Sequence, residues 1–205
     1  MARYTDAKCK LCRREGTKLF LKGDRCYTAK CAIERRPFAP GMHGKTPKKF
    51  SDYGVRLRNK QMAKRFYGPG EKSFYNTYVS AVKKTGVTGT VFLQLLESRL
   101  DNVVYRGGLA DSRAEARQLV RHGHFSLNGH PVDVPSMKLK KDDKVTIKYE
   151  SKKTAVQLEK AKDRKVPNWL EVDLAKKEIR FLSVPERKEI DAPFEEQYIV
   201  EYYSK

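Results

Sequence analysis

The sequence has 205 residues and a formal net charge of +19, from 44 Lys and Arg against 25 Asp and Glu. A hydrophobic fraction of 39% is enough for a modest core, and no apolar run reaches the roughly 18 residues of a membrane-spanning helix. The first residues, Met1 to Asp6, lack the apolar segment and cleavage site of a secretory signal, so we expect a cytoplasmic protein whose partners are polyanions.

The positive charge is concentrated in the first half of the chain. Residues 1–96 contain 22 basic and 6 acidic side chains, whereas the charges of residues 97–205 are nearly balanced. Solubility alone needs a net charge of only about 2–8 in a small domain, and a larger excess destabilises a compact fold unless a polyanion neutralises it. No segment pairs a long apolar face with a basic face. We therefore expect nucleic acid as the partner and no membrane.

The four cysteines form two close pairs within 23 residues. Cys9 and Cys12 are separated by two residues, and Cys26 and Cys31 by four. This spacing is typical of a structural zinc site with four thiolates, which leaves no open position for catalysis. Nearby Lys and Arg side chains are expected to favour the thiolate form. An iron–sulfur cluster, two disulfides and four unrelated thiols are the alternatives, and disulfides would need an oxidising compartment.

Residues 32–50 hold three Pro and two Gly, which predicts an extended loop without a helix. We expect this loop to be disordered alone and to become ordered on RNA. Its basic residues, which would line an RNA groove, are Arg35, Arg36, Lys45, Lys48 and Lys49.

Two helices are predicted next, over residues 51–66 and 71–84, with a Gly-Pro-Gly stop between them. A basic stripe, Arg56, Lys60 and Lys64, recurs every four residues in the first of these helices. Such a stripe can simply be a solvated helix face. Its position in the cationic half favours RNA contact instead.

Residues 88–105 carry a clean apolar stripe and are predicted to form one core helix. Ser112 and Glu115 then form a capping box that opens a helix to about His122. Arg113, Arg117 and Arg121 recur every four residues in this helix, and we interpret them as one guanidinium stripe.

The remaining signals predict a small sheet. Asn128-Gly129 is a strong hairpin turn, residues 145–149 alternate as a strand, and residues 169–174 and 179–182 are consistent with a last hairpin. Residues 151–165 are a helix or a linker. Residues 198–203 are too apolar for a free tail and must dock, as strand or helix. The fold class predicted is therefore α+β.

Several of these segments resemble a known family. Residues 96–106, 112–124 and 128–129 look like the small RNA-binding module named after bacterial small-subunit ribosomal protein four. Arg3-Tyr4, the cysteine pairs and the C-terminal residues 199–204 extend the resemblance to that ribosomal protein family over the whole chain. Many members lack the cysteines, so this sequence resembles the zinc-carrying branch.

The resemblance implies a structural constituent of the small ribosomal subunit that binds 16S ribosomal RNA early, nucleates assembly of the subunit body and contributes to translational accuracy. It also implies contacts with small-subunit protein five and other small-subunit proteins, a position near the path by which messenger RNA enters, and in some members repression of their own messenger. In the module, the arginine stripe with His122 and His124 matches the helix that faces RNA.

Together these observations predict four regions: a zinc-binding basic extension (1–45), a helical rRNA-binding domain (46–97), the RNA-binding module (98–160) and a C-terminal hairpin and tail that dock back on the body (161–205). The residues expected to bind RNA are Arg3, Arg13, Arg14, Lys22, Lys30, Arg35, Arg36, Lys45, Lys48, Lys49, Arg56, Lys60, Lys64, Lys83, Lys84, Arg113, Arg117, Arg121, His122 and His124.

Two other functions compete with this interpretation. RNA-modifying and aminoacylating enzymes carry the same module, but this chain shows no convincing acid–base pair, and its Gly-Pro-Gly segment lacks the Lys and Ser or Thr of a phosphate loop. We therefore expect no catalytic residues and no small-molecule substrate. A free RNA chaperone or translational repressor is the remaining alternative, which its presence or absence in purified small subunits would test.

Overall fold

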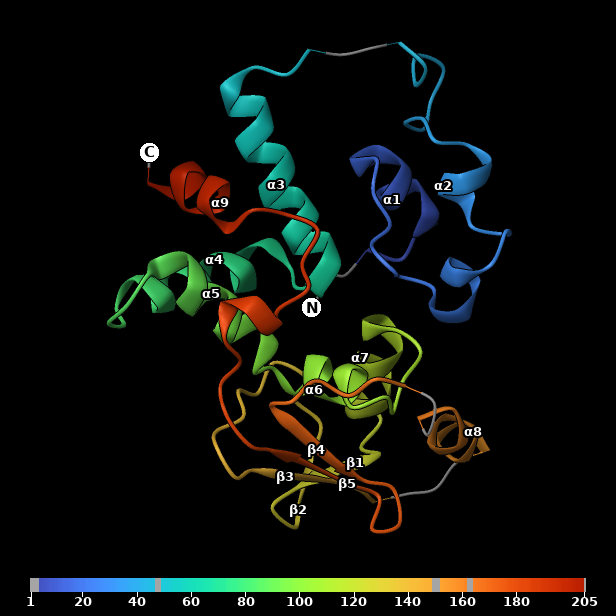
Figure 1. The fold of residues 1–205 in the computed structure, drawn as a ribbon, viewed down its shortest axis with the longest axis vertical. Helices are drawn as coiled ribbons and strands as arrows, with labels where there is room; N and C mark the ends of the chain where they lie inside the picture. The colour runs from blue at the N-terminus through green and yellow to red at the C-terminus, as the bar shows by residue number, and fades with distance from the viewer. Residues whose placement is uncertain (1–3, 47–48, 149–151, 162–163, 205) are drawn as a thin grey trace. The chain divides into compact units, whose positions relative to one another are not determined.

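The structure is a computed structural model that describes residues 4–46, 49–148, 152–161 and 164–204. It divides the chain into two compact units, which Figure 1 shows with their helices and strands labelled. The first unit joins Met1–Phe92 to Asp191–Lys205, and the second is Leu93–Ile190. In the described part of the chain, no helix is long and apolar enough to cross a membrane.

The first unit is helical. Its elements are α1 (Cys9–Glu15), the 3-10 helix η1 (Gly23–Tyr27), α2 (Ala32–Arg35), α3 (Asp52–Tyr67), α4 (Glu71–Val82), the start of α5 (Thr88–Glu97) and α9 (Glu196–Tyr203). The expectation of no helix in residues 32–50 is wrong, because α2 forms one turn there. The Arg36 N–H donates to the Ala32 carbonyl at 3.0 Å, and Pro37 follows directly. Four residues free of Pro and Gly are enough for that turn.

Helices α3 and α4 lie where the sequence predicts them. The Ser51 hydroxyl accepts the Gly54 N–H at 3.3 Å and caps the start of α3. Gly68 ends the helix in the left-handed region, at φ 77°, and its N–H donates to the Lys64 carbonyl. Both ends of α3 are therefore set by local sequence.

The C-terminal segment forms a helix, α9, which packs against α3. Ile199 is fully buried, and Phe194 makes edge-to-face contacts with Phe66 and Tyr67 at centroid distances of 5.8 and 6.2 Å. The ring centroids of Tyr203 and Tyr78 lie 4.8 Å apart. The last residues of the chain thus complete the core of the first unit.

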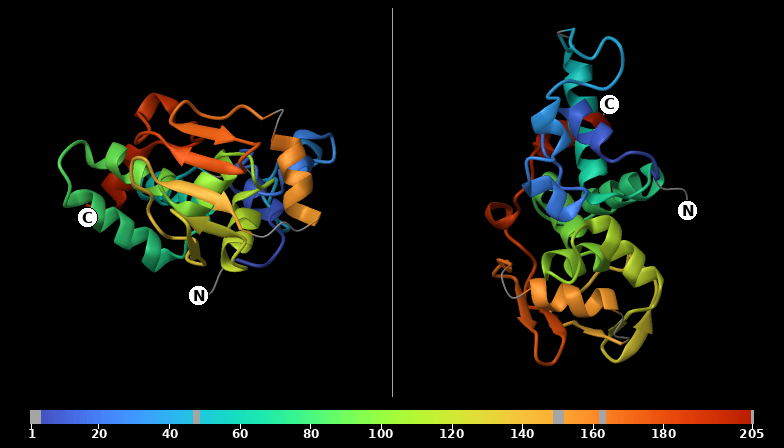
Figure 2. Two further views of the ribbon diagram at one scale, coloured as in Figure 1. Left: turned by 90° about the horizontal axis from the view of Figure 1, so that it is seen from below. Right: turned by 90° about the vertical axis from the view of Figure 1, so that its right-hand side faces the viewer.

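The second unit combines helices with an antiparallel sheet. Its elements after α5 are α6 (Leu100–Arg106), α7 (Arg113–Arg121), β1 (Phe125–Leu127), β2 (His130–Val132), β3 (Lys144–Ile147), α8 (Lys152–Ala161), β4 (Leu170–Asp173), β5 (Glu178–Phe181) and the 3-10 helix η2 (Arg187–Glu189). The strand order is β2-β1-β3-β5-β4. Figure 2 shows the strands, coloured yellow to red-orange, as one layer with yellow-green α6 and α7 on one face. The α+β prediction is confirmed.

The predicted helix over residues 88–105 is interrupted in the structure. Arg99 has an extended conformation and pairs with Lys138 in an isolated β-bridge. The Leu100 N–H donates to the Met137 carbonyl, and the Leu139 N–H donates to the Ser98 carbonyl, both at 2.8 Å. Backbone groups from a segment about forty residues downstream therefore replace the helical hydrogen bonds, and α5 and α6 are separate helices.

The region predicted as one C-terminal part, residues 161–205, is divided between the units. Strand β5 pairs with β3 through Val145 and Ile179, so the last hairpin completes the sheet of the second unit. Trp169 is buried beside Phe181, at a centroid distance of 5.6 Å. Residues 191–204, by contrast, belong to the first unit.

Candidate nucleic-acid interface

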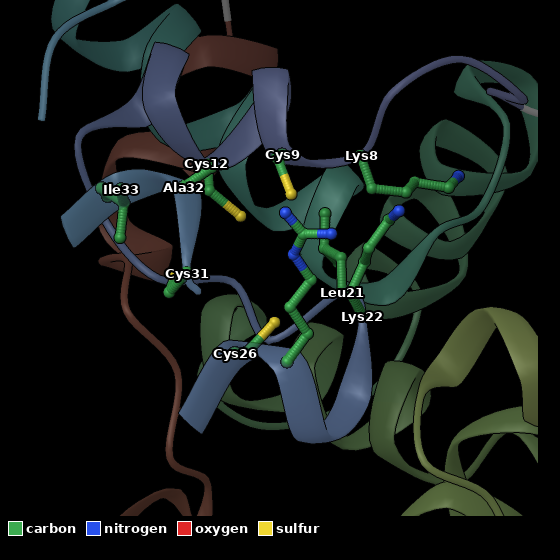
Figure 3. A pocket seen from close by; sticks show the side chains of 10 residues that line it. Lys8, Cys9, Cys12, Leu21, Lys22, Cys26, Cys31, Ala32 and Ile33 are labelled. Atoms are coloured by element: carbon green, nitrogen blue, oxygen red, sulfur yellow. The ribbon is translucent and has the colours of Figure 1, made fainter. Parts of the chain in front are cut away.

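The four cysteines converge on one pocket of the first unit. Cys9 and Cys12 lie on α1, Cys26 lies in η1, and Cys31 is the N-cap of α2. In Figure 3 the side chains of Cys9, Cys12 and Cys26 point toward the middle of this pocket. All four thiols are free. Lys8, Lys22 and Arg25 also line the pocket.

The environment of two of the thiols is dominated by burial. Burial raises the pKa of Cys12 and of Cys26, and backbone N–H groups only partly offset that rise. At these two positions burial is the largest influence on the thiol pKa. Among the residues that the structure describes, no three His, Cys, Asp or Glu side chains are arranged as a metal site. The four cysteines therefore line one pocket, but their sulfur atoms are not in positions to coordinate one ion.

Arg13 holds the loop that follows α2. Its Nε donates to the Phe38 carbonyl at 3.0 Å, and its guanidinium lies 5.2 Å from the centroid of the Phe38 ring. Lys45, which is exposed, lies over the same ring at 5.3 Å. Residues 42–45 form a turn, with bends at 38, 40, 41 and 46. The expectation that RNA orders this loop stays a prediction. Lys48 and Arg3 lie outside the described residues.

The basic stripe of α3 is engaged with carboxylates. Arg56 Nε lies 2.7 Å from a carboxylate oxygen of Glu201, and Lys64 lies 2.7 Å from Glu71. Lys60 is buried, pairs with Glu71 and lies 4.9 Å from the centroid of the Tyr202 ring. Burial opposes ionisation of Glu71, but the two lysines hold its pKa below the ordinary value. These three cations therefore stabilise the contacts of α3 with α4 and α9, and RNA contact by them stays a prediction.

Ten of the predicted RNA-binding Lys and Arg residues have exposed side chains that an RNA backbone can reach. They are Arg14, Lys22, Lys30, Arg35, Arg36, Lys45, Lys49, Lys83, Lys84 and Arg121. Nine of these ten belong to the first unit, so its exposed surface is strongly cationic.

The arginines of α7 do not form one exposed stripe. Arg113 is buried: its Nε donates to the Asn102 Oδ1 at 2.8 Å, and its guanidinium lies 4.5 Å from the Tyr105 ring. Arg117 is half-buried and lies 3.1 Å from Asp101. Arg121 is exposed. A four-residue step advances about 40° beyond a full helical turn, so the stripe rotates from the core to the surface along α7.

The two predicted histidines lie at the end of α7 and just beyond it. His122 is exposed and His124 half-buried, and their rings are stacked with centroids 6.4 Å apart. With Arg121 they form the accessible polar end of this helix. RNA contact by these residues remains a prediction.

A buried polar network in α5 and α6 was not predicted. The Glu97 side chain is fully buried and accepts hydrogen bonds from Arg106 at 2.9 and 3.1 Å. Arg99 and Asp101, also buried, form a bidentate pair at 2.8 and 3.0 Å. The sequence does show several charged residues within an apolar stripe. Such residues can lie in a core only if they pair with residues of opposite charge.

Replacing Arg113 is expected to destabilise the second unit. The Arg113→Met substitution removes the hydrogen bond that Asn102 accepts, and a buried acceptor left without a partner costs about 1–3 kcal/mol. Urea unfolding followed by the fluorescence of Trp169, the single and buried tryptophan, measures this loss. Arg121→Met on the same helix is the matched control, with an expected change within about 0.5 kcal/mol. Equal losses in the two variants would contradict the burial of Arg113.

A helical unit with a cationic surface, joined to a unit of helices and antiparallel sheet, is typical of an RNA-binding protein. Residues 3–97 match the family described as Ribosomal protein S4/S9 N-terminal domain, and residues 98–145 match the S4 domain.

Relatives that match over their full length show which family the whole chain belongs to. The chain is 53% identical over 208 residues to small ribosomal subunit protein uS4 of Desulforamulus reducens. It is 56% identical over 207 residues to uS4A of Alkaliphilus metalliredigens and 51% over 209 residues to uS4 of Thermus thermophilus. All three comparisons cover 100% of both chains. The chain belongs to the ribosomal protein uS4 family, which confirms the family resemblance found in the sequence. Its place in the zinc-carrying branch stays a prediction.

Proposed function

We propose that this chain is a structural, non-catalytic constituent of the small ribosomal subunit that binds 16S ribosomal RNA directly in the cytoplasm. The similarity over the full length to proteins named small ribosomal subunit protein uS4 carries the proposal. The exposed cations of the first unit support it physically, because neutralisation of phosphates by Lys and Arg supplies much of the affinity of such proteins for RNA.

The proposal extends to early binding and to neighbours in the subunit. Each unit has its own folded core, so the protein offers preformed surfaces, which suit recognition of RNA by shape. We infer that such binding nucleates assembly of the subunit body. Contacts with small-subunit protein five, with other small-subunit proteins and with messenger RNA, and a contribution to translational accuracy, are the expected consequences of that position.

The proposed role predicts where the protein is found. The tagged full chain, expressed in cells, is expected at about one copy per purified small subunit, and the pure protein is expected to bind a 16S transcript in a one-to-one complex. Quantitative mass spectrometry of washed subunits measures the first, and filter binding the second. Protein found mainly off the subunit would instead indicate a free chaperone or repressor, and turnover of RNA by the pure protein would indicate an enzyme.

The proposal includes one structural zinc ion held by Cys9, Cys12, Cys26 and Cys31. The donor set supports it: four free thiols from three short helices line a single pocket. The ion, when bound, would supply a cross-link between these helices. The thiols would release their protons and draw together, since they are not yet in a coordinating arrangement. An iron–sulfur cluster is the alternative for the same donors.

The residues around the pocket explain why a cross-link would matter. In the described residues 4–46, Leu19 is fully buried, but the other buried apolar side chains are only Leu11, Cys26 and Cys31. A segment of about 40 residues with so little core usually needs a metal, disulfides or a partner to fold. The four thiols would give it that support without adding apolar surface.

A further inference from the structure

Glu15 lies at the C-terminal end of α1 among arginines of two helices. Its side chain is only 1% exposed. One carboxylate oxygen, Oε1, pairs with Arg65 and lies 3.5 Å from Arg58, both on α3. Arg14, the residue before Glu15, is exposed. We name Arg14, Arg58 and Arg65 the Glu15 arginine cluster.

The cluster holds more positive charge than Glu15 neutralises. Arg58 and Arg65 contact the same oxygen atom, so their guanidinium groups lie within a few ångströms of each other. Burial raises the pKa of Glu15, while Arg65, Arg58 and Arg14 all act to lower it. Burial also lowers the pKa of Arg65; Glu15 opposes this change, and Arg58 and Arg14 add to it. Three like charges thus act on one another around a single carboxylate.

The guanidinium groups remain accessible. The side chains of Arg58 and Arg65 are 25% and 22% exposed, in addition to the exposed Arg14. A guanidinium carries five N–H donors, so contact with one carboxylate oxygen leaves donors for another anion. Helices α1 and α3 belong to the same unit, and the ion pairs with Glu15 fix the positions of Arg58 and Arg65. The fixed groups would therefore lose little side-chain entropy on binding an anion.

We propose that the Glu15 arginine cluster is a binding site for a phosphate group of the RNA backbone. The inference deepens the proposed function and rests on it. A phosphate would neutralise the surplus charge of the cluster and accept hydrogen bonds from more than one guanidinium, the geometry for which arginine suits phosphate better than lysine does. Glu15 is a positioning residue in this site. It contacts the arginines and not the phosphate.

The test counts phosphate contacts through the salt dependence of binding. The double variant Arg14→Gln/Arg58→Gln keeps the Glu15–Arg65 pair intact. Binding to a 16S transcript is measured between 50 and 200 mM salt. Each lost phosphate contact lowers the slope of log affinity against log salt by roughly 0.7–0.9. Loss of the one phosphate contact of this site is therefore expected to lower the slope by that amount and to weaken binding about tenfold at 0.1 M salt.

The matched control removes the same formal charge from the second unit. Lys176→Gln/Arg180→Gln changes two cations of the β4–β5 hairpin, each paired with an aspartate, and is expected to leave the slope unchanged. Urea unfolding of both variants shows whether they are folded. A folded Arg14→Gln/Arg58→Gln protein with the wild-type slope would overturn the site. If wild-type binding itself lacked salt dependence, the proposed function would fail instead.

Discussion

Raising the salt concentration from 50 to 200 mM is expected to weaken the binding of the full chain to 16S RNA by several orders of magnitude. For 6–10 phosphate contacts, the loss is about 10³–10⁵-fold on the scale of double-stranded DNA and somewhat smaller on RNA. The reason is that each neutralised phosphate releases counterions, and release is less favourable in concentrated salt. Filter binding or fluorescence anisotropy over the salt series gives the slope directly.

The charge distribution makes this prediction specific to one unit. Lys83 and Lys84 are exposed at the end of α4 in the first unit, whereas Lys140 and Lys141 are exposed before β3 in the second. Changing the first pair to Gln is expected to lower the salt slope by about 1.5, and changing the second pair is expected to lower it less. A flat salt response of the wild-type protein would contradict the account of RNA binding by phosphate neutralisation.

Local sequence signals predicted the elements that local interactions fix. The Ser112 hydroxyl accepts the Glu115 N–H at 3.3 Å, as the predicted N-cap requires, whereas the Glu115 carboxylate accepts the N–H of Asp111, the residue before the N-cap, at 2.8 Å. Asn128 and Gly129 both adopt positive φ, at 50° and 86°, which is the geometry that the hairpin turn demands. Each of these features involves residues within four positions of one another, so no knowledge of the tertiary fold was needed.

Interactions between distant residues could not be predicted in this way. The interruption at Arg99 depends on backbone groups of residues 135–139. The conformation of the C-terminal tail depends on an apolar face of α3 that the sequence shows only as scattered aromatics. Helical spacing places Arg113 and Arg121 near one face of their helix. It does not show that Arg113 is buried and donates to Asn102, because that contact depends on the packing of α6 against α7.

In the candidate site, too, the sequence predicted the local features and not the contacts between distant residues. Sequence alone identified the cysteine pairs and most of the exposed cations of the first unit, because spacing and composition are local properties. It missed Arg58 and Arg65, which pair with Glu15 from positions more than forty residues away. It also treated Arg56 and Lys60 as free cations, although the carboxylates that they contact, Glu201 and Glu71, lie on other helices.

Loss of the cysteines is expected to remove a bound metal and loosen the N-terminal segment. Purified wild-type protein should contain about one zinc per chain, and the Cys9→Ser/Cys12→Ser variant none. Apparent zinc affinities of small structural sites correspond to about 10–16 kcal/mol near neutral pH, far more than the buried residues of this segment supply. Limited proteolysis should therefore cleave residues 4–46 faster in the variant, while unfolding followed by Trp169 should not change.

The second cysteine pair provides the matched control. If all four sulfurs hold one ion, Cys26→Ser/Cys31→Ser should lose the metal as completely as the first variant, because two remaining thiolates cannot fix it. A strong chelator should make wild-type cleavage resemble that of either variant and leave the variants unchanged. Iron with visible absorption would indicate the cluster alternative. Metal-free wild-type protein whose N-terminal segment resists protease as well as the loaded form would contradict the structural metal, since packing of α1 against α3 would then suffice.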